Sequence, residues 1–147
     1  MNNQIKVLLV EDSLADARLI IEVFKEERIS VDLDIARDGE EAMAYLYRQG
    51  KYKNAKRPDC IILDLNLPIK DGREVLAEIK ADANLKSIPV VILTTSQSEE
   101  DIIKSYKLQA SCYVTKPIDL EQFVKMIKSI DQFWFSAVRF PAKNEHS

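Results

Sequence analysis

Glycine is scarce in this chain, and its spacing excludes the common nucleotide-binding loops. The 147 residues contain three glycines, Gly39, Gly50 and Gly72, which stand far apart. Neither a P-loop nor a G-x-G-x-x-G turn can be built from them, because both motifs need closely spaced glycines around a bound phosphate. The chain therefore has no evident ATP site of its own.

Cysteine and histidine are also rare, which excludes a metal centre built on these residues. Cys60 and Cys112 both fall in predicted strands, where we interpret them as buried thiols, and His146 in a polar tail is the only histidine. A zinc site needs more such ligands. Reduced thiols and a polar start without signal-peptide features are typical of a cytoplasmic protein.

Long apolar runs and an excess of positive charge are missing as well. No apolar stretch in the sequence reaches the ~20 residues of a membrane span. The net charge of -3 argues against binding to nucleic acid or to a membrane surface. Hydrophobic residues make up 46% and charged residues 31%, which is typical of one ordinary globular domain.

What the sequence does contain is a strict alternation of short apolar runs and segments with helical periodicity. Such alternation predicts an α/β fold with a parallel sheet, right-handed crossovers and helices on both faces. The predicted strands are residues 6–10, 31–36, 60–63, 89–93 and 111–114. The five predicted helices are residues 14–28, 39–48, 71–81, 98–107 and 119–139.

Polar side chains stand where these strands end. Glu11 and Asp12 follow the first strand, Asp64 the third and Lys116 the fifth, while Thr94 comes directly after the fourth. Because parallel strands deliver their carboxyl ends to one edge of the sheet, we expect these residues to meet there. Crowded carboxylates repel one another, and a hard divalent cation such as Mg²⁺ relieves that repulsion.

This set of side chains suits phosphoryl transfer onto Asp64. A carboxylate is a competent nucleophile toward phosphorus. The loose transition state spreads charge over the equatorial oxygens, so that positioning and positive charge do most of the work. We expect Mg²⁺ to take one of these oxygens, the Lys116 ammonium a second and the Thr94 hydroxyl a third.

Several short motifs, taken in order, resemble the receiver domain of bacterial response regulators. The resemblance implies a flavodoxin-like, doubly wound sheet of order 2-1-3-4-5 in a domain over residues 5–131, with 132–147 an extension of the last helix and a tail without a separate output domain. It also implies a histidine kinase as phosphoryl donor. The motifs are Val10-Glu11-Asp12, Leu63-Asp64-Leu65-Asn66-Leu67-Pro68, Asp71-Gly72, Leu93-Thr94-Thr95 and Tyr113-Val114-Thr115-Lys116-Pro117.

The resemblance also implies a role for each matching residue. Asp64 would be the phosphoacceptor, and Mg²⁺ (or Mn²⁺) would be bound by the side chains of Asp12 and Asp64. The backbone carbonyl of Asn66 would complete the protein ligands, with Glu11 acting through the metal's water shell.

Thr94 and Tyr113 match the switch pair of the family, Lys116 its phosphate-binding lysine, and Pro117 the proline that follows that lysine, often through a cis bond. Such a chain is a phosphoacceptor signalling protein rather than an enzyme, with Mg²⁺-dependent self-phosphorylation from a donor and weak autodephosphorylation. The surface of the fourth helix, fifth strand and fifth helix would report its state.

A narrower resemblance is to the stand-alone regulators that serve cyanobacterial phytochromes. Residues 64–80 and Phe133-Trp134 carry it. It implies a phytochrome-type kinase as partner, although neither the input signal, the downstream target nor the lifetime of the phosphoryl group can be inferred from one sequence.

The last predicted helix has more apolar surface than one core-facing stripe requires, which favours an interface. We predict a homodimer formed by Phe133, Trp134 and Phe135 together with the face near Ile102 and Tyr106. The alternative is an extension that folds back on its own domain.

Two other classes of function remain open at this point. Phosphatases of the haloacid-dehalogenase type also use an aspartyl nucleophile after a strand, but they normally need a second acid two residues later, where this chain has Asn66. The other alternative is a docking or dimerisation module that works without phosphorylation. It predicts that Asp64→Asn leaves partner affinity and oligomeric state unchanged.

Overall fold

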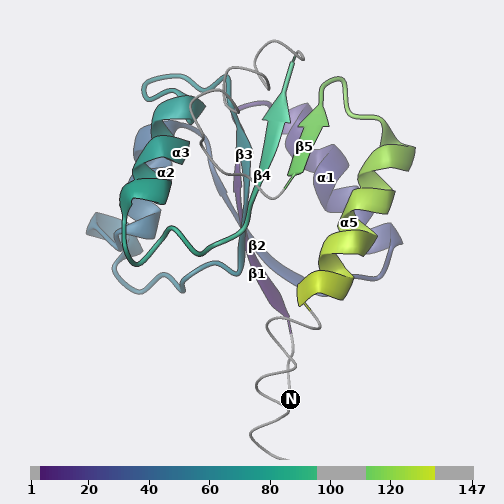
Figure 1. The fold of residues 1–147 in the computed structure, drawn as a ribbon, viewed down its shortest axis with the longest axis horizontal. Helices are drawn as coiled ribbons and strands as arrows, with labels where there is room; N and C mark the ends of the chain where they lie inside the picture. The colour runs from purple at the N-terminus through teal and green to yellow at the C-terminus, as the bar shows by residue number, and fades with distance from the viewer. Residues whose placement is uncertain (1–3, 96–111, 135–147) are drawn as a thin grey trace, which may run out of the picture.

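A single parallel sheet of five strands forms the centre of the molecule, with the order β2-β1-β3-β4-β5 (Figure 1). This computed structural model describes residues 4–95 and 112–134. All four neighbouring strand pairs are parallel, and the predicted sheet order is confirmed. The strands are β1 (Ile5–Val10), β2 (Val31–Ala36), β3 (Cys60–Asp64), β4 (Val90–Thr94) and β5 (Cys112–Thr115).

Helices cover both faces of this sheet. The helices α1 (Leu14–Glu26) and α5 (Leu120–Trp134) lie on one face, and α2 (Gly39–Leu46) and α3 (Gly72–Ala81) lie on the other (Figure 1). A short 3-10 helix, η1 (Gly50–Tyr52), follows α2. The helix predicted over residues 98–107, and the part of the last predicted helix beyond Trp134, lie outside the described residues.

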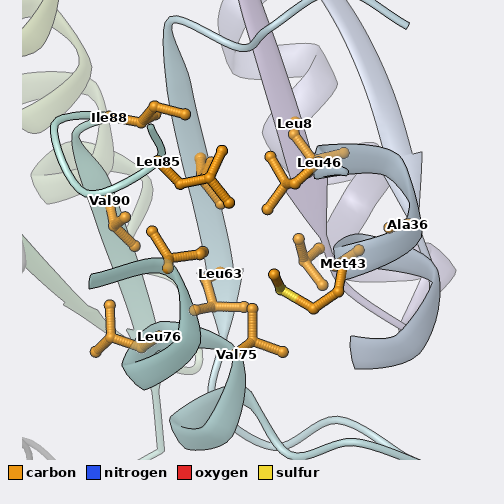
Figure 2. Close-up of a cluster of buried hydrophobic side chains, with 14 of the residues drawn as sticks. Leu8, Ala36, Met43, Leu46, Leu63, Val75, Leu76, Leu85, Ile88 and Val90 are labelled. Atoms are coloured by element: carbon orange, nitrogen blue, oxygen red, sulfur yellow. The ribbon is translucent and has the colours of Figure 1, made fainter. Parts of the chain in front are cut away.

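The core consists of two apolar layers, one on each side of the sheet. Along β1, Leu8 faces the layer under α2 and α3, whereas Leu9 faces the layer under α1 and α5. Figure 2 shows the first layer, in which Leu63 of β3 points toward Val75 and Leu76 of α3. Because β3 and β4 are buried on both faces, they have no polar alternation and read as continuous apolar runs.

Two helices end earlier than the periodicity predicts. The residues that follow them, Arg28 and Arg48, adopt left-handed backbone conformations with φ of 58° and 57°. This conformation terminates a helix and is usually supplied by glycine. The stops at Glu26 and Leu46 were therefore not visible in the sequence. Within the described ranges, no helix is both long and apolar enough to span a membrane.

Candidate functional site

The carboxyl edge of the sheet brings together side chains that are far apart in the sequence. Asp64 and Thr94 are the last residues of β3 and β4, and Glu11 directly follows β1. Lys116 follows β5. Its backbone N–H donates to the Thr94 carbonyl oxygen at 2.7 Å, which holds the backbone of Lys116 beside the end of β4. Glu11, Asp64 and Thr94 are at most 2% exposed. The predicted meeting of these residues is thus present in the structure.

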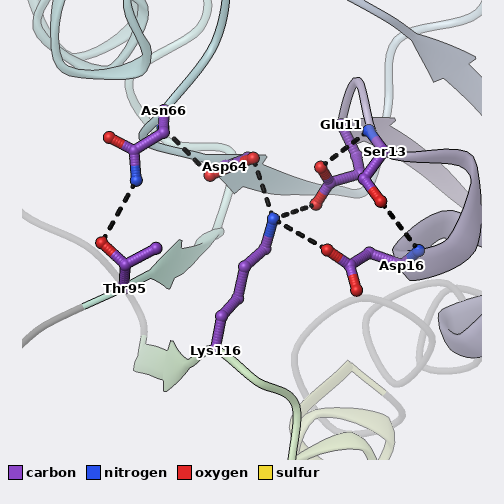
Figure 3. A network of polar contacts seen from close by, with 7 residues as sticks. All are labelled: Glu11, Ser13, Asp16, Asp64, Asn66, Thr95 and Lys116. Carbon is purple, nitrogen blue, oxygen red and sulfur yellow. Dashed lines mark hydrogen bonds and ion pairs between the residues drawn. The ribbon is translucent and has the colours of Figure 1, made fainter.

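The Lys116 ammonium is the centre of the site (Figure 3). Its Nζ lies 2.9 Å from Glu11 Oε1, 3.0 Å from Asp64 Oδ2 and 3.1 Å from Asp16 Oδ2. Burial alone would lower the pKa of Lys116, but the attraction of the Glu11 and Asp64 carboxylates outweighs burial and raises that pKa. The lysine is therefore charged at neutral pH.

Glu11 is a carboxylate held almost entirely out of water. Burial raises its pKa to about 7, against the opposing effects of Lys116 and of the Ser13 backbone N–H, which donates to Oε2 at 3.1 Å. The other oxygen, Oε1, has the Lys116 ion pair but no hydrogen bond to any residue in the described part of the chain. A buried oxygen of this kind has capacity for a further positive group.

Asp64 is oriented by its neighbour two residues later. The Asn66 backbone N–H donates to Asp64 Oδ1 at 3.0 Å, and the Asn66 side chain donates to Thr95 Oγ1 at 3.4 Å (Figure 3). One Asp64 oxygen thus accepts from the backbone and the other from Lys116. The hydrogen bond from the Asn66 side chain gives Thr95 a partner in the loop after β3, which the sequence did not indicate.

Three carboxylates at this edge could hold a cation. One oxygen each of Glu11, Asp12 and Asp64 lie within 4.8 Å of one another, and Asp12 is exposed. Hard divalent cations prefer oxygen ligands of this kind and keep part of their water shell. The exposed Asp12 leaves one side of the cluster open to such water.

Asp16 is a residue of this site that the sequence analysis did not identify, because it lies in a helix rather than at a strand end. The cap of α1 is Ser13, whose Oγ accepts from the Asp16 backbone N–H at 3.2 Å. Side chains of a first helical turn point back toward the preceding strand end. An acid in that turn, directly after a strand that ends in Glu11, is the signal that would have found it.

The loop between β3 and α3 closes tightly behind Asp64. Gly72 donates its N–H to the Leu65 carbonyl oxygen at 3.0 Å, and a Cβ at this position would lie 2.3 Å from the Asp64 carbonyl oxygen. Only glycine fits so close an approach. The Asp71-Gly72 motif therefore shapes the loop beside the site, and Asp71 is the N-cap of α3.

The remaining predicted residues are placed in part. Tyr113 is half-buried and packs against the apolar layer under α2 and α3. The peptide bond between Lys116 and Pro117 is cis, as the resemblance implied. Of the predicted dimer residues, Ile102, Tyr106 and Phe135 lie outside the described residues, as do the side chains of Phe133 and Trp134 at the end of α5.

Comparison with known proteins decides the family. The model of the response regulator receiver domain matches residues 7–128. This chain belongs to the response regulator receiver family. The response regulator Rcp1 of Synechocystis sp. is 56% identical over 136 residues, which cover 92% of each chain. The probable methanogenesis regulatory protein FilR2 of Methanothrix harundinacea is 37% identical, over 92% of this chain and 86% of its own.

Solved structures support the same assignment for this receiver. The Mn²⁺-bound form of Rcp1 is 56% identical, covers 90% of this chain and 96% of its own, and superposes with a TM-score of 0.76. The phosphorylated cyanobacterial phytochrome response regulator RcpA is 53% identical, covers 92% and 96%, and has a TM-score of 0.78. The predicted relation to phytochrome response regulators is confirmed, and the phosphatase alternative falls away.

Proposed function

We propose that this receiver is a single-domain two-component response regulator that accepts a phosphoryl group from a histidine kinase on Asp64. We propose residues 5–131 as the receiver domain and residues 132–147 as an extension of its last helix and a tail. The observation that carries the proposal is the Lys116 ammonium 3.0 Å from Asp64 Oδ2, at a site where acids gather around the buried phosphoacceptor.

The residues present fit Mg²⁺ or Mn²⁺. Glu11, Asp12 and Asp64 bring oxygens within 4.8 Å of one another, and the buried Glu11 Oε1 has no hydrogen bond within the described ranges. Asp12 and Asp64 would bind the ion by side chain and Asn66 by its carbonyl oxygen, with Glu11 acting through water. A bound divalent ion supplies positive charge for one oxygen of the transferred group.

The chain's own residues perform the transfer. An oxygen of the Asp64 carboxylate attacks phosphorus as the bond from phosphorus to the histidine nitrogen breaks, and that nitrogen keeps the electron pair. The Asn66 N–H holds Asp64 in place, and Lys116 donates to a phosphoryl oxygen. The Thr94 hydroxyl donates to another. Attack of water on phosphorus later returns the free carboxylate and phosphate, which is a weak autodephosphorylation.

The switch follows from the added charge. A phosphoryl group brings roughly -1.5 to -2 charge at pH 7 to the buried end of β3. Movement of the Thr94 hydroxyl toward that group frees space beside β4, and the half-buried Tyr113 turns inward. These changes bias the surface of the fourth helix, β5 and α5 between two states.

The partner we propose is a phytochrome-type histidine kinase. Support comes from the 53% identity to RcpA, a regulator described as serving a cyanobacterial phytochrome. We also propose a homodimer built on the end of α5. Both belong to the same signalling role, because the kinase sets the phosphorylation state and the α5 surface reports it.

The test is phosphorylation with acetyl phosphate and Mg²⁺, followed by intact-protein mass spectrometry. We expect one acid-labile phosphoryl group on the wild type, none on Asp64→Asn and none when the metal is removed with EDTA. Asp32→Asn is the matched control, because Asp32 lies in the edge strand β2, where its carboxylate forms an ion pair with Lys6; it should be labelled like the wild type.

Labelling of Asp64→Asn would contradict the assignment of the phosphoacceptor. A different result separates signalling from the docking alternative. If phosphorylation occurs but neither it nor Asp64→Asn changes kinase affinity or oligomeric state, the chain acts as a phosphorylation-independent module on a receiver fold.

A further inference from the structure

The proposed chemistry uses two of the three carboxylates around Lys116, and leaves Asp16 without a task. Asp16 Oδ2 lies 3.1 Å from Nζ, nearly as close as Glu11 at 2.9 Å and Asp64 at 3.0 Å (Figure 3). A lysine ammonium has three N–H donors. The Lys116 ammonium forms three ion pairs, and the one with Asp64 Oδ2 is also a hydrogen bond.

Local structure fixes Asp16 in this position. Ser13 caps α1 by accepting from the Asp16 N–H at 3.2 Å, and its own N–H donates to Glu11 Oε2 at 3.1 Å. Ser13 thus links the Glu11 carboxylate to the backbone of Asp16. An acid in a first helical turn is also favoured by the helix dipole. The side chain of Asp16 is 31% exposed, against 0% for Glu11 and 2% for Asp64.

We propose that Asp16 is a positioning residue for phosphoryl acceptance, which acts by holding the Lys116 ammonium in line with Asp64. The inference rests on the proposed function. When Asp64 takes up the phosphoryl group, the N–H that pointed to Asp64 Oδ2 turns to a phosphoryl oxygen. Glu11 and Asp16 keep their ion pairs with the ammonium, so it stays in place during the transfer.

Loss of Asp16 has a specific kinetic signature. Without Asp16, Glu11 is the one carboxylate of the three that stays paired with the Lys116 ammonium throughout the transfer. The ammonium is then held less firmly, so the maximal rate of phosphorylation falls. The affinity for an anionic donor does not fall, because the change removes a negative charge near its path. A merely structural defect would not separate the two quantities in this way.

The experiment measures initial rates of phosphorylation by acetyl phosphate at saturating Mg²⁺, with the full chain. We expect Asp16→Ala to lower the maximal rate about fivefold, within the range of coupling between contacting charged groups, with KM unchanged or lower. Asp16→Asn, which keeps an acceptor oxygen, should lose less. Glu22→Gln removes an exposed acid from the same helix, where it contacts the exposed Lys25, and should match the wild type.

A double-mutant cycle decides whether the effect passes through the lysine. In a Lys116→Met background, Asp16→Ala should change the rate no further. The same fivefold loss in that background, or a wild-type maximal rate in Asp16→Ala and Asp16→Asn, would overturn the inference while leaving the proposed function intact. A wild-type protein that takes no phosphoryl group from acetyl phosphate would overturn both.

Discussion

At the scale of single residues, two lysines of this chain have similar electrostatics but lie at opposite ends of the parallel strands. Lys116 and Lys6 each lie among carboxylates that raise the lysine pKa against the lowering effect of burial. Lys6 belongs to the amino-terminal end of β1, and Lys116 follows the carboxyl end of β5. A perturbed pKa is therefore not sufficient to mark a functional lysine. Its position at the edge where parallel sheets bind ligands is what distinguishes Lys116.

The Lys6 cluster gives a prediction about pH and stability. Asp34 Oδ2 accepts from Lys6 Nζ at 2.7 Å and from the Tyr45 hydroxyl at 2.6 Å, and both bonds lower the pKa of Asp34. Because the pKa of Asp34 is lower in the folded protein than in the unfolded chain, its carboxylate stabilises the folded state at pH values above the unfolded pKa of about 3.9. This stabilisation is lost as the pH falls through the pKa of Asp34 in the folded state.

Asp34→Asn should therefore lower the free energy of unfolding by about 1 kcal/mol at pH 7, a small value because the carboxylate is half exposed. The difference from wild type should shrink as pH drops below about 4. Urea unfolding at a series of pH values measures it. Asp32→Asn is the control, since Asp32 lies 3.3 Å from Lys6 Nζ and should lose less. A difference that persists unchanged at low pH would contradict this account.

At the scale of elements, the sequence predicts what depends on apolar pattern and misses what depends on backbone detail. The buried strands β3 and β4 were found because continuous apolar runs bounded by polar residues have few other interpretations. Their last residues, Asp64 and Thr94, were predicted to lie just beyond the strands because polar residues are typical of loops. The helix ends at Glu26 and Leu46 were missed because the left-handed residues that follow, Arg28 and Arg48, carry no sequence signal for that conformation.

Gly72 links the geometry of the loop to Asp64, the proposed phosphoacceptor, and this link can be tested by mutation. A Cβ on Gly72 would meet the Asp64 carbonyl oxygen at 2.3 Å and the Leu65 Cα at 2.5 Å, so that backbone must move. We expect Gly72→Ala to destabilise the protein by about 2 kcal/mol, as overpacking of a close contact does. Because the displaced backbone carries Asp64, phosphorylation by acetyl phosphate should also slow.

Gly50 provides the matched control. It has a φ of 57°, and a Cβ added there would meet no atom of the described residues within 4 Å, so Gly50→Ala should cost about 1 kcal/mol of backbone strain only. Its phosphorylation rate should equal that of the wild type. A wild-type rate in Gly72→Ala would show that the approach of α3 to β3 does not set the position of Asp64.

At the scale of the whole molecule, alternation predicted a parallel sheet, but not which strands are neighbours. The order β2-β1-β3-β4-β5 came from the resemblance to receivers, because apolar periodicity carries no information on pairing. The gathering of Glu11, Asp64 and Lys116 followed from the common edge. The contact of a third carboxylate, Asp16, with Lys116 could not be predicted in this way, because Asp16 reaches the site from a helix rather than from a strand end.

The last helix is where the molecule as a whole would change its state. Its described part ends at Trp134, and apolar residues continue in the sequence through Phe135, Val138 and Phe140. An excess of apolar residues at the end of a chain favours association, as in the predicted homodimer. These apolar residues could be buried against a second copy of the chain or against the chain's own domain, and the two arrangements predict different results.

We expect light scattering at micromolar concentration to give the mass of a dimer for the wild type, and of a monomer for Phe135→Asp, because a buried charge opposes the interface. Lys128→Asp, a charge change on an exposed residue of α5 that pairs with Glu27, is the control and should remain dimeric. An extension that folds back predicts a monomeric wild type and a less stable Phe135→Asp. The measurement with and without acetyl phosphate then shows whether Asp64 controls assembly, since a mass that is the same in both conditions would separate dimerisation from the switch.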